Sequence, residues 1–183
     1  EVDLSLLFVD VRGSTNLAEQ MTATEFSRLM NRFYGVATGV LVKTNAFIDK
    51  LVGDEVIGIY LPIFTGPNHA RPATEAALEL LRATGHGGRG SPWLPVGVGV
   101  HTGRAFFGTV SGAEGTFSDF TALGDTVNTT ARVASAAHAG EALITDAAYI
   151  AAGLDLPNLE QRCLALKGKS EPVNVRVVQI ASN

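Results

Sequence analysis

The stretch FVDVRGST, Phe8–Thr15, ends a run of apolar residues with an aspartate and then turns. The apolar run before it predicts a buried strand over residues 4–9, which Asp10 closes. The turn Gly13-Ser14-Thr15 leads into a helix predicted over residues 16–20. The sequence therefore places a carboxylate at the rim of a buried strand, where it either caps a turn or serves a site.

Helix and strand patterns alternate along the rest of the chain. Thr22 and Glu25 match a capping box, and the apolar residues after them recur at helical spacing as far as Leu41, which predicts a long amphipathic helix. Further helices are predicted over residues 72–84, 125–137 and 146–152, the second with Asp125 as a candidate N-cap. Strand patterns cover residues 46–52, 55–61, 96–101, 105–111, 117–123, 142–145, 164–166 and 173–180, with hairpin turns at Gly53-Asp54 and Thr102-Gly103-Arg104. This order indicates an α+β fold, in which helices pack on a mostly antiparallel sheet.

The composition is that of one globular domain over residues 1–183. Hydrophobic residues make up 46% and charged residues 17% of the chain, and the net charge of −4 gives no general attraction to nucleic acids. Cys163 is the only cysteine, which excludes an intrachain disulfide, and no apolar run reaches the length of a membrane span. We therefore expect a cytoplasmic location without membrane contact. The chain has no starting methionine and enters a strand at once, so a fragment of a longer protein is expected.

Asp10 and Asp54 form the first candidate site. Asp10 ends one strand and Asp54 lies at a hairpin tip, so both reach one edge of the sheet if that strand lies beside the hairpin. Two carboxylates at a rim suit Mg²⁺, which takes hard oxygen ligands and completes its shell with water and substrate phosphates. The alternative, which spacing alone favours, is that both are ordinary turn aspartates.

Candidates for phosphate binding are scattered along the chain. Gly13-Ser14-Thr15 offers backbone N–H groups at a helix start, although the G-x-x-x-x-G-K-[ST] spacing of a Walker motif is absent. Basic residues stand in or near tight turns, where they either bind a polyphosphate or are simply exposed. These residues are Lys50, Arg104, Arg132, Lys167 and Lys169.

Asn128 and Arg132 lie four residues apart and share one face of a predicted helix. A polar pair beside an apolar stripe suits either a ligand site or a solvated helix face, and the residues alone leave both open. His101 stands in an apolar strand pattern, where a hydrogen-bonded core histidine is expected rather than a metal ligand.

Taken together, the motifs are more specific than any one of them. In the order FVDVRGST, KLVGDE, VGVHTGR, LGDTVNTTAR and LKGKSEPV, they resemble the catalytic domain of class III nucleotidyl cyclases, from Leu4 to about Val178. The resemblance implies a ferredoxin-like βαββαβ core and a head-to-tail homodimer with two equivalent sites at its interface. It also implies adenylyl cyclase activity, the conversion of ATP to 3′,5′-cyclic AMP and pyrophosphate, with two Mg²⁺ or Mn²⁺ ions per active site.

The resemblance also assigns roles by motif position. Metal binding falls to Asp10, Val11 and Asp54, base selection to Lys50 and Thr121, ribose orientation to Asn128, and transition-state stabilisation to Arg132. Triphosphate binding falls to Arg104 and Lys167, with Lys169 as the alternative to Lys167. The phosphate contact of Gly13, Ser14 and Thr15 rests on their place at a helix start.

Thr121 departs from the pattern of many adenylyl cyclases, which have aspartate at this position. Family members with threonine there are associated with a response to bicarbonate or CO₂, so bicarbonate is an expected partner beside ATP. A hydroxyl can donate or accept a hydrogen bond, so it discriminates adenine from guanine less sharply than a carboxylate does. A guanylyl or relaxed purine cyclase is one alternative, and a non-catalytic nucleotide-binding module is another. A diguanylate-cyclase palm domain would need a GG[DE]EF hairpin, which KLVGDEV lacks.

Overall fold

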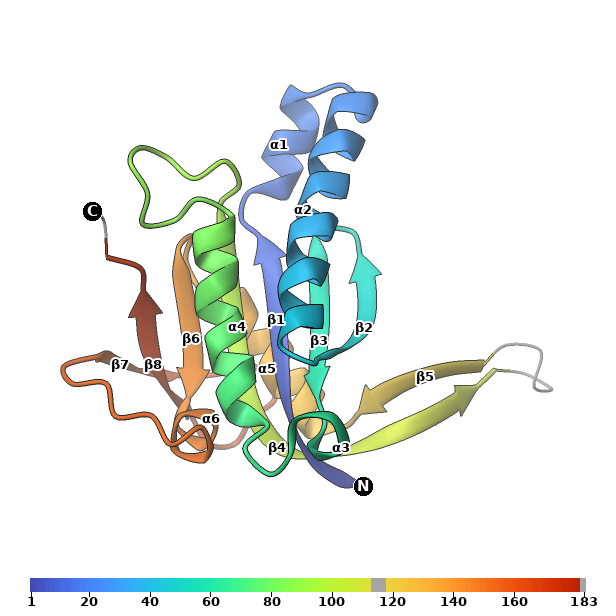
Figure 1. The fold of residues 1–183 in the computed structure, drawn as a ribbon, viewed down its shortest axis with the longest axis vertical. Helices are drawn as coiled ribbons and strands as arrows, with labels where there is room; N and C mark the ends of the chain where they lie inside the picture. Colours follow the sequence, from blue (N-terminus) through green and yellow to red (C-terminus); the bar gives the residue numbers. More distant parts are fainter. Residues whose placement is uncertain (113–117, 182–183) are drawn as a thin grey trace.

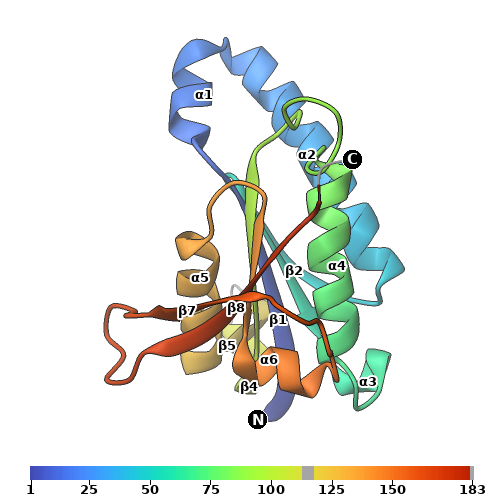
Figure 2. The same ribbon diagram turned by 90° about the vertical axis from the view of Figure 1, so that its left-hand side faces the viewer.

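A sheet of eight strands forms the centre of the protein in the computed structural model, which describes residues 1–112 and 118–181. Helices cover both faces of this sheet, as Figure 1 and Figure 2 show. The strands are β1 (Val2–Val11), β2 (Phe47–Val52), β3 (Glu55–Tyr60), β4 (Val96–Ser111), β5 (Ser118–Leu123), β6 (Glu141–Thr145), β7 (Glu160–Leu164) and β8 (Val173–Gln179). The helices are α1 (Ser14–Gln20), α2 (Ala23–Lys43), α3 (Pro62–Thr65), α4 (Ala70–Ala83), α5 (Asp125–Ala136) and α6 (Asp146–Ala151).

The strand order explains how distant parts of the sequence meet. It runs β2-β3-β1-β4-β6-β8-β7, with β5 paired to β4 alone. Among the described residues, β4 and β6 form the one parallel pair, and the other pairs are antiparallel. The strands β1 to β4, with α2 and α4 between them, make a ferredoxin-like βαββαβ core. The predicted α+β fold with a mostly antiparallel sheet is confirmed.

β1 is buried on both faces because helices cover both sides of the sheet. Leu7 belongs to a core that also contains Phe33 of α2 and Leu80 of α4. The adjacent Leu6 belongs to a second core, with Ala134 of α5. Successive side chains of a strand point to opposite faces, so a strand that is covered twice has an uninterrupted apolar sequence. This double cover is the reason that the run before Asp10 contains so little polar character.

The capping box predicted at the start of α2 is present. The Thr22 hydroxyl accepts a hydrogen bond from the Glu25 N–H at 3.3 Å, and the Glu25 carboxylate accepts one from the Thr22 N–H at 2.9 Å. These bonds satisfy N–H groups that the first helical turn leaves free. No helix among the described residues is long and apolar enough to cross a bilayer.

β4 is one continuous strand, so the hairpin predicted around Thr102-Gly103-Arg104 is wrong. These three residues pair with β1 in an unbroken antiparallel register. Gly103 provides space rather than a turn, because a Cβ there would lie 2.8 Å from Thr126 Oγ1 of α5. Gly99 gives room to the backbone of Ala134 in the same way. The glycines of β4 therefore mark the close packing of a helix.

Three smaller expectations also need correction or cannot be compared. Gly124, with a φ of 132° that favours glycine, is the N-cap of α5, and Asp125 is its first helical residue. The strand predicted over residues 164–166 lies earlier in the chain, as β7. Residue 117, the predicted start of β5, lies outside the described residues.

β4 and β5 extend away from the helices as a two-stranded arm, at the lower right of Figure 1. The arm exposes 43% of Phe106, 47% of Phe120 and 47% of Leu123. Phe107 and Phe120 stack edge to face at its base, with their ring centroids 4.6 Å apart. Neighbouring exposed side chains of this size are typical of a surface that another protein covers.

Candidate active site

Asp10 and Asp54 lie at one edge of the sheet, as predicted. Asp10 is near the end of β1, in register with Glu55 at the start of β3. Asp54 precedes Glu55 in the β2–β3 turn, and its carbonyl accepts a hydrogen bond from the Val11 N–H at 3.0 Å. The chain turns through Gly53, whose φ of 61° favours glycine. β1 therefore lies beside the hairpin that carries Asp54, which is the condition for the two carboxylates to share a site.

At this carboxylate edge, formed by Asp10 and Asp54, the charged form of Asp10 is disfavoured. Burial raises the pKa of Asp10 from 3.8 to about 6, with a further rise from Asp54 that opposes the lowering by Arg12. Arg12 Nη2 pairs with Asp10 Oδ2 at 2.7 Å, and the Ser14 hydroxyl donates to Asp54 Oδ2. Burial and the two aspartates also raise the pKa of Glu55. A nearby cation would stabilise carboxylates whose charged form is disfavoured in this way.

The residues of the carboxylate edge fit a hard divalent cation. Asp10 and Asp54 offer carboxylate oxygens, and the backbone of Val11 lies between them. Mg²⁺ is usually held by one or two carboxylates, and it keeps several waters or phosphate oxygens. Among residues 1–112 and 118–181, no group of three or more His, Cys, Asp or Glu side chains is arranged to hold a metal. Asp10 and Asp54 therefore fit part of a coordination shell that a polyphosphate could complete.

The turn Gly13-Ser14-Thr15 lies next to the carboxylate edge. Gly13 adopts the left-handed conformation with a φ of 71°, and α1 begins at Ser14. Residues from both turns, including Ser14, Thr15, Gly53 and Asp54, line a hollow of about 310 Å³. The predicted phosphate-binding turn and the predicted metal-binding residues are therefore neighbours.

Lys50 and Thr121 also meet, although 71 positions separate them in the sequence. Lys50 Nζ, from β2, donates a hydrogen bond to Thr121 Oγ1 of β5 at 3.4 Å. The same ammonium lies 3.4 Å from Asp119 Oδ2 and 3.9 Å from Asp49 Oδ2. Thr121 is buried, whereas the Lys50 side chain is 39% exposed and can reach a ligand. We call these four residues the lysine corner: Lys50, Thr121, Asp49 and Asp119.

Asn128 and Arg132 lie on α5, which packs behind the sheet in Figure 1. Asn128 is exposed and Arg132 is partly buried. The Arg132 guanidinium lies against Gly168 in the turn before β8, since a Cβ on that glycine would be 3.4 Å from its nitrogens. The structure thus brings Arg132 to the turn that carries the predicted triphosphate-binding lysine.

The two lysines of that turn differ in their surroundings. Lys169 forms an ion pair with Asp125 at the start of α5, whereas the side chain of Lys167 is exposed. Arg104, the other predicted triphosphate ligand, is 69% exposed on β4 and lies 3.7 Å from Glu1. Lys167 and Arg104 are therefore accessible to an anion.

The predicted residues form separate groups within one chain. In the described part of the chain, no side-chain hydrogen bond or ion pair joins the carboxylate edge to the lysine corner, or either group to Asn128 or Arg132. A head-to-tail dimer, in which each site takes groups from two copies, is compatible with this arrangement.

Sequence reasoning indicated neither Asp49 nor Asp119, and it placed Arg12 only at the start of the predicted phosphate-binding turn, not beside Asp10. Asp119 could have been found, because it lies two residues before Thr121 on a strand and residues at that spacing share a face. Arg12 stands in the quoted motif, but its pairing with Asp10 depends on side-chain direction. His101 is hydrogen-bonded, as predicted, but partly rather than fully buried: its Nδ1 lies 2.9 Å from Thr145 Oγ1, and burial lowers its pKa to about 4.

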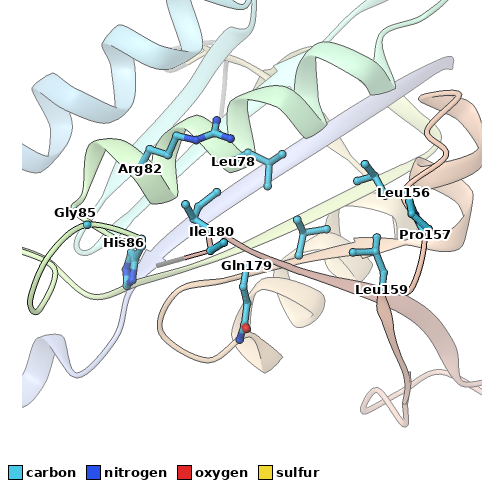
Figure 3. A pocket seen from close by; sticks show the side chains of 13 residues that line it. Leu78, Arg82, Gly85, His86, Leu156, Pro157, Leu159, Gln179 and Ile180 are labelled. Atoms are coloured by element: carbon cyan, nitrogen blue, oxygen red, sulfur yellow. The ribbon is translucent and has the colours of Figure 1, made fainter. Parts of the chain in front are cut away.

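A cavity of about 680 Å³ lies apart from all of these groups, between α4, the loop after it and the end of β8. Figure 3 shows Leu78, Leu159 and Ile180 among the side chains that line it. None of the predicted site residues contributes to its lining. The hollow beside Ser14, Thr15 and Asp54 is smaller, at about 310 Å³.

Comparison with known proteins identifies the family. The family model of the adenylate and guanylate cyclase catalytic domain matches residues 2–176. The chain is 28% identical over 187 residues to an adenylate cyclase of Anabaena cylindrica, and this match covers 96% of the chain and 36% of that protein. It is 30% identical over 181 residues to the terminal-differentiation specific adenylate cyclase of Dictyostelium discoideum, covering 94% of the chain and 8% of that protein.

Solved structures agree with this result. The adenylyl cyclase CyaB from P. aeruginosa is 30% identical, with a TM-score of 0.81, and the match covers 97% of this chain and 94% of that one. The guanylyl cyclase Cya2 has a TM-score of 0.85 at 24% identity, over 99% of this chain and 93% of that one, and shows the shared fold. Because the family model spans nearly the whole sequence, the chain belongs to the adenylate and guanylate cyclase catalytic domain family.

Proposed function

We propose that the protein converts ATP to 3′,5′-cyclic AMP and pyrophosphate at sites shared by two copies of the chain. The observation that carries this proposal is that Asp10 and Asp54 lie together at one edge of a cyclase fold. In the same fold, Lys50 of β2 contacts Thr121 of β5. Adenine rather than guanine is favoured by the lysine at position 50. The names of the Anabaena and Dictyostelium relatives and of CyaB favour it too.

Asp10 and Asp54, with the Val11 carbonyl, would hold two Mg²⁺ or Mn²⁺ ions. Such ions neutralise phosphate charge and lower the pKa of the ribose 3′-hydroxyl. The raised pKa of Asp10 supports this assignment, because a bound cation would stabilise a carboxylate whose charge is disfavoured by burial and, to a smaller extent, by Asp54. Arg12, paired with Asp10 at 2.7 Å, would keep that carboxylate oriented.

The other residues would hold and stabilise the reacting phosphates. The ribose 3′-oxygen attacks the α-phosphorus, the bond from phosphorus to the bridging oxygen breaks, and pyrophosphate leaves. Arg132 would stabilise the charge that develops at the α-phosphate in the transition state, and Asn128 would orient the ribose. Arg104 and Lys167 would bind the triphosphate, and the exposure of both supports this role. Gly13, Ser14 and Thr15 would offer N–H and hydroxyl donors beside it.

Lys50 and Thr121 would read the edge of the purine. The lysine donates to adenine N1, and the threonine hydroxyl accepts from the N6 amino group. Guanine reverses this order of donor and acceptor, and each unpaired buried group costs about 1–3 kcal/mol. The distance of 3.4 Å between Lys50 Nζ and Thr121 Oγ1 supports a shared ligand for the two groups.

A head-to-tail homodimer would complete the sites, because one chain carries every role but separates the groups. Two copies related by a twofold axis contain two equivalent sites. The exposed apolar side chains of the β4–β5 arm, Phe106 and Phe120 among them, support self-association.

A guanylyl or relaxed purine cyclase is the second candidate, favoured by Thr121, and competition between ATP and GTP in one assay decides it. Thr121 is also the only basis for expecting a response to bicarbonate. Cyclic AMP formation that is unchanged by bicarbonate at fixed pH would remove that expectation. A non-catalytic nucleotide-binding module would bind nucleotide without any turnover.

Mixing inactive variants tests the shared site. Asp54→Ala and Arg132→Ala damage different halves of a site, so a mixed dimer regains one intact site of two. Random pairing should then restore about one quarter of the wild-type activity. The matched control is a mixture of Asp10→Ala and Asp54→Ala, which damages the same half in both copies and should restore nothing. Equal activity in the two mixtures contradicts a site built from two chains.

A further inference from the structure

Asp49 is a buried carboxylate without a role in the reaction described above. Its side chain is 6% exposed, and its Oδ1 is buried without a hydrogen-bond partner of standard geometry among the described residues. A buried polar atom that lacks a hydrogen bond is costly, and native proteins contain few of them. Its position behind Lys50 and Thr121 indicates a role in the lysine corner.

A β-bulge in β2 turns Asp49 toward this corner. The register shifts between Ile48, which pairs with Gly58, and Lys50, which pairs with Ile57, so Asp49 is the extra residue. Neighbouring residues of a regular strand point to opposite faces, yet Asp49 Oδ2 lies 3.9 Å from Lys50 Nζ. Bulges redirect side chains in this way and are frequent beside active sites.

The groups around the Thr121 hydroxyl determine the direction of its proton. Lys50 Nζ, at 3.4 Å, can only donate, so it uses one lone pair of the hydroxyl oxygen. The acceptors nearby are the Ala122 carbonyl at 3.5 Å and the Asp49 carboxyl. Burial raises the pKa of Asp49, and a hydrogen bond with Thr121 and the charge of Lys50 oppose that rise. Donation to either of these acceptors would point the hydroxyl proton inward and leave a lone pair of the Thr121 oxygen for a ligand.

We propose that Asp49 sets the preference for ATP over GTP by holding the Thr121 hydroxyl as a hydrogen-bond acceptor toward the base. This inference rests on the proposed function, because it requires that Lys50 and Thr121 read the purine edge. The amino group of adenine donates to such an acceptor, whereas the O6 of guanine would meet a lone pair. A threonine supported by Asp49 thus acts like the aspartate that many adenylyl cyclases have at its position. Asp49 is a positioning residue, since it acts through Thr121.

The test replaces the acceptor behind Thr121 by a group that can also donate. In Asp49→Asn the amide can donate to the Thr121 oxygen, so the hydroxyl is free to donate to guanine O6. The probes are 3′-deoxy-ATP and 3′-deoxy-GTP with Mg²⁺, which lack the attacking hydroxyl, and calorimetry measures their dissociation constants. We expect the ratio of the two constants to move toward the guanine nucleotide by about ten-fold, equivalent to one hydrogen bond of about 1.4 kcal/mol.

Two further variants separate this role from a general disturbance. Asp119→Asn makes the same chemical change beside the same lysine, at a carboxylate that is 39% exposed, and should leave the ratio within two-fold. Thr121→Val removes the hydroxyl, so adding Asp49→Asn to it should not change the ratio further. If Asp49→Asn does not fold, Asp49→Ser serves the same purpose, because its hydroxyl also donates and accepts.

An unchanged ratio in a folded Asp49 variant overturns the inference, as does an equal change in the presence and absence of the Thr121 hydroxyl. A wild-type protein that binds neither analogue overturns it as well. A wild-type protein that binds 3′-deoxy-ATP but forms no cyclic AMP from ATP contradicts the proposed function alone. The binding ratios still decide the role of Asp49 in that case.

Discussion

Two regions of the molecule bury carboxyl groups, one fully and one in part, and surround them with different partners. Glu141, on β6, is 3% exposed, and Arg162 of β7 donates to both of its oxygens at 2.8 and 2.7 Å. The backbone N–H of His138 adds a bond at 2.9 Å. The hydrogen bonds from Arg162 hold the pKa of Glu141 below its usual range. At the carboxylate edge, burial and Asp54 raise the pKa of Asp10 to about 6.

This difference in hydrogen-bond partners and pKa distinguishes a carboxylate that stabilises the fold from carboxylates that are suited to binding a ligand. Glu141 has its donors within the chain and ties β6 to β7, so it needs nothing else. The charged form of Asp10 is disfavoured by burial despite its pair with Arg12, and a bound cation would stabilise it. Removing a charge should therefore affect stability in the first region and activity in the second.

The largest effect is expected at the carboxylate edge. Asp10→Ala or Asp54→Ala removes a metal ligand and should lower the rate of cyclic AMP formation by at least about 10³-fold, since metal ions contribute several kcal/mol to such reactions. The melting temperature should stay the same or rise, because each change removes one of two like charges. Calorimetry and a product assay measure the two effects.

Asp155→Ala is the matched control, because this aspartate is exposed and lies outside the site groups. It should change neither property. Full activity in both site variants would show that Asp10 and Asp54 are ordinary turn residues.

The next effect concerns the compensated region. Arg162→Met leaves Glu141 buried without its main donor, so we expect the free energy of unfolding to fall by about 2–3 kcal/mol. For a chain of this length this lowers the melting temperature by about 4–12 °C. Activity per folded molecule should be retained.

Arg71→Met provides the comparison at the surface, where Arg71 and Glu75 pair with 55% and 60% of their side chains exposed. The loss there should stay below about 1 kcal/mol. Equal losses of unfolding free energy in Arg162→Met and Arg71→Met would contradict the claim that the buried Glu141 depends on Arg162.

A smaller effect should distinguish the two lysines beside Arg132. Lys167→Met removes an exposed cation that would contact the triphosphate, and should raise the KM for ATP by about ten-fold. Lys169→Met breaks the pair with Asp125 instead and should leave KM nearly unchanged. The opposite result would exchange the roles of the two residues.

The smallest effect is a difference in the pH dependence of stability, measured with a chelator present. The lowered pKa of Glu141 means that its stabilisation is complete above pH 4.5 and is lost as the pH falls through its folded pKa. The raised pKa of Asp10 has the opposite sign, so ionisation of Asp10 destabilises the fold as the pH rises from 3.8 to about 6. The difference in the free energy of unfolding between Glu141→Gln and the wild type should therefore disappear at low pH. Asp10→Asn should be more stable than the wild type at neutral pH. Parallel curves for the three proteins would refute this contrast.

Local signals predicted the parts of the site that lie at strand ends and turns. Asp10 closes an apolar run and Asp54 follows a turn glycine, so their positions could be read from short segments. The prediction that β1 lies beside β3 came from the family resemblance. The structure confirms that β1 pairs with β3, with Asp10 opposite Glu55.

Features that depend on distant packing could not be predicted in the same way. Thr102-Gly103-Arg104 fits a turn as well as a strand, and only the approach of Thr126 shows that Gly103 makes room for a helix. Asp49 is directed to Thr121 by a bulge, and alternation along β2 gives no sign of it. The compensation of Glu141 likewise depends on a strand that follows it by some twenty residues.

Product formation from ATP and, separately, from GTP tests the central claim most directly, with Mg²⁺ and then Mn²⁺, over a range of protein concentrations. We expect cyclic AMP from ATP at a rate that rises faster than linearly with protein concentration, because two copies must associate before a site is complete. Formation of neither cyclic nucleotide under any of these conditions would contradict it.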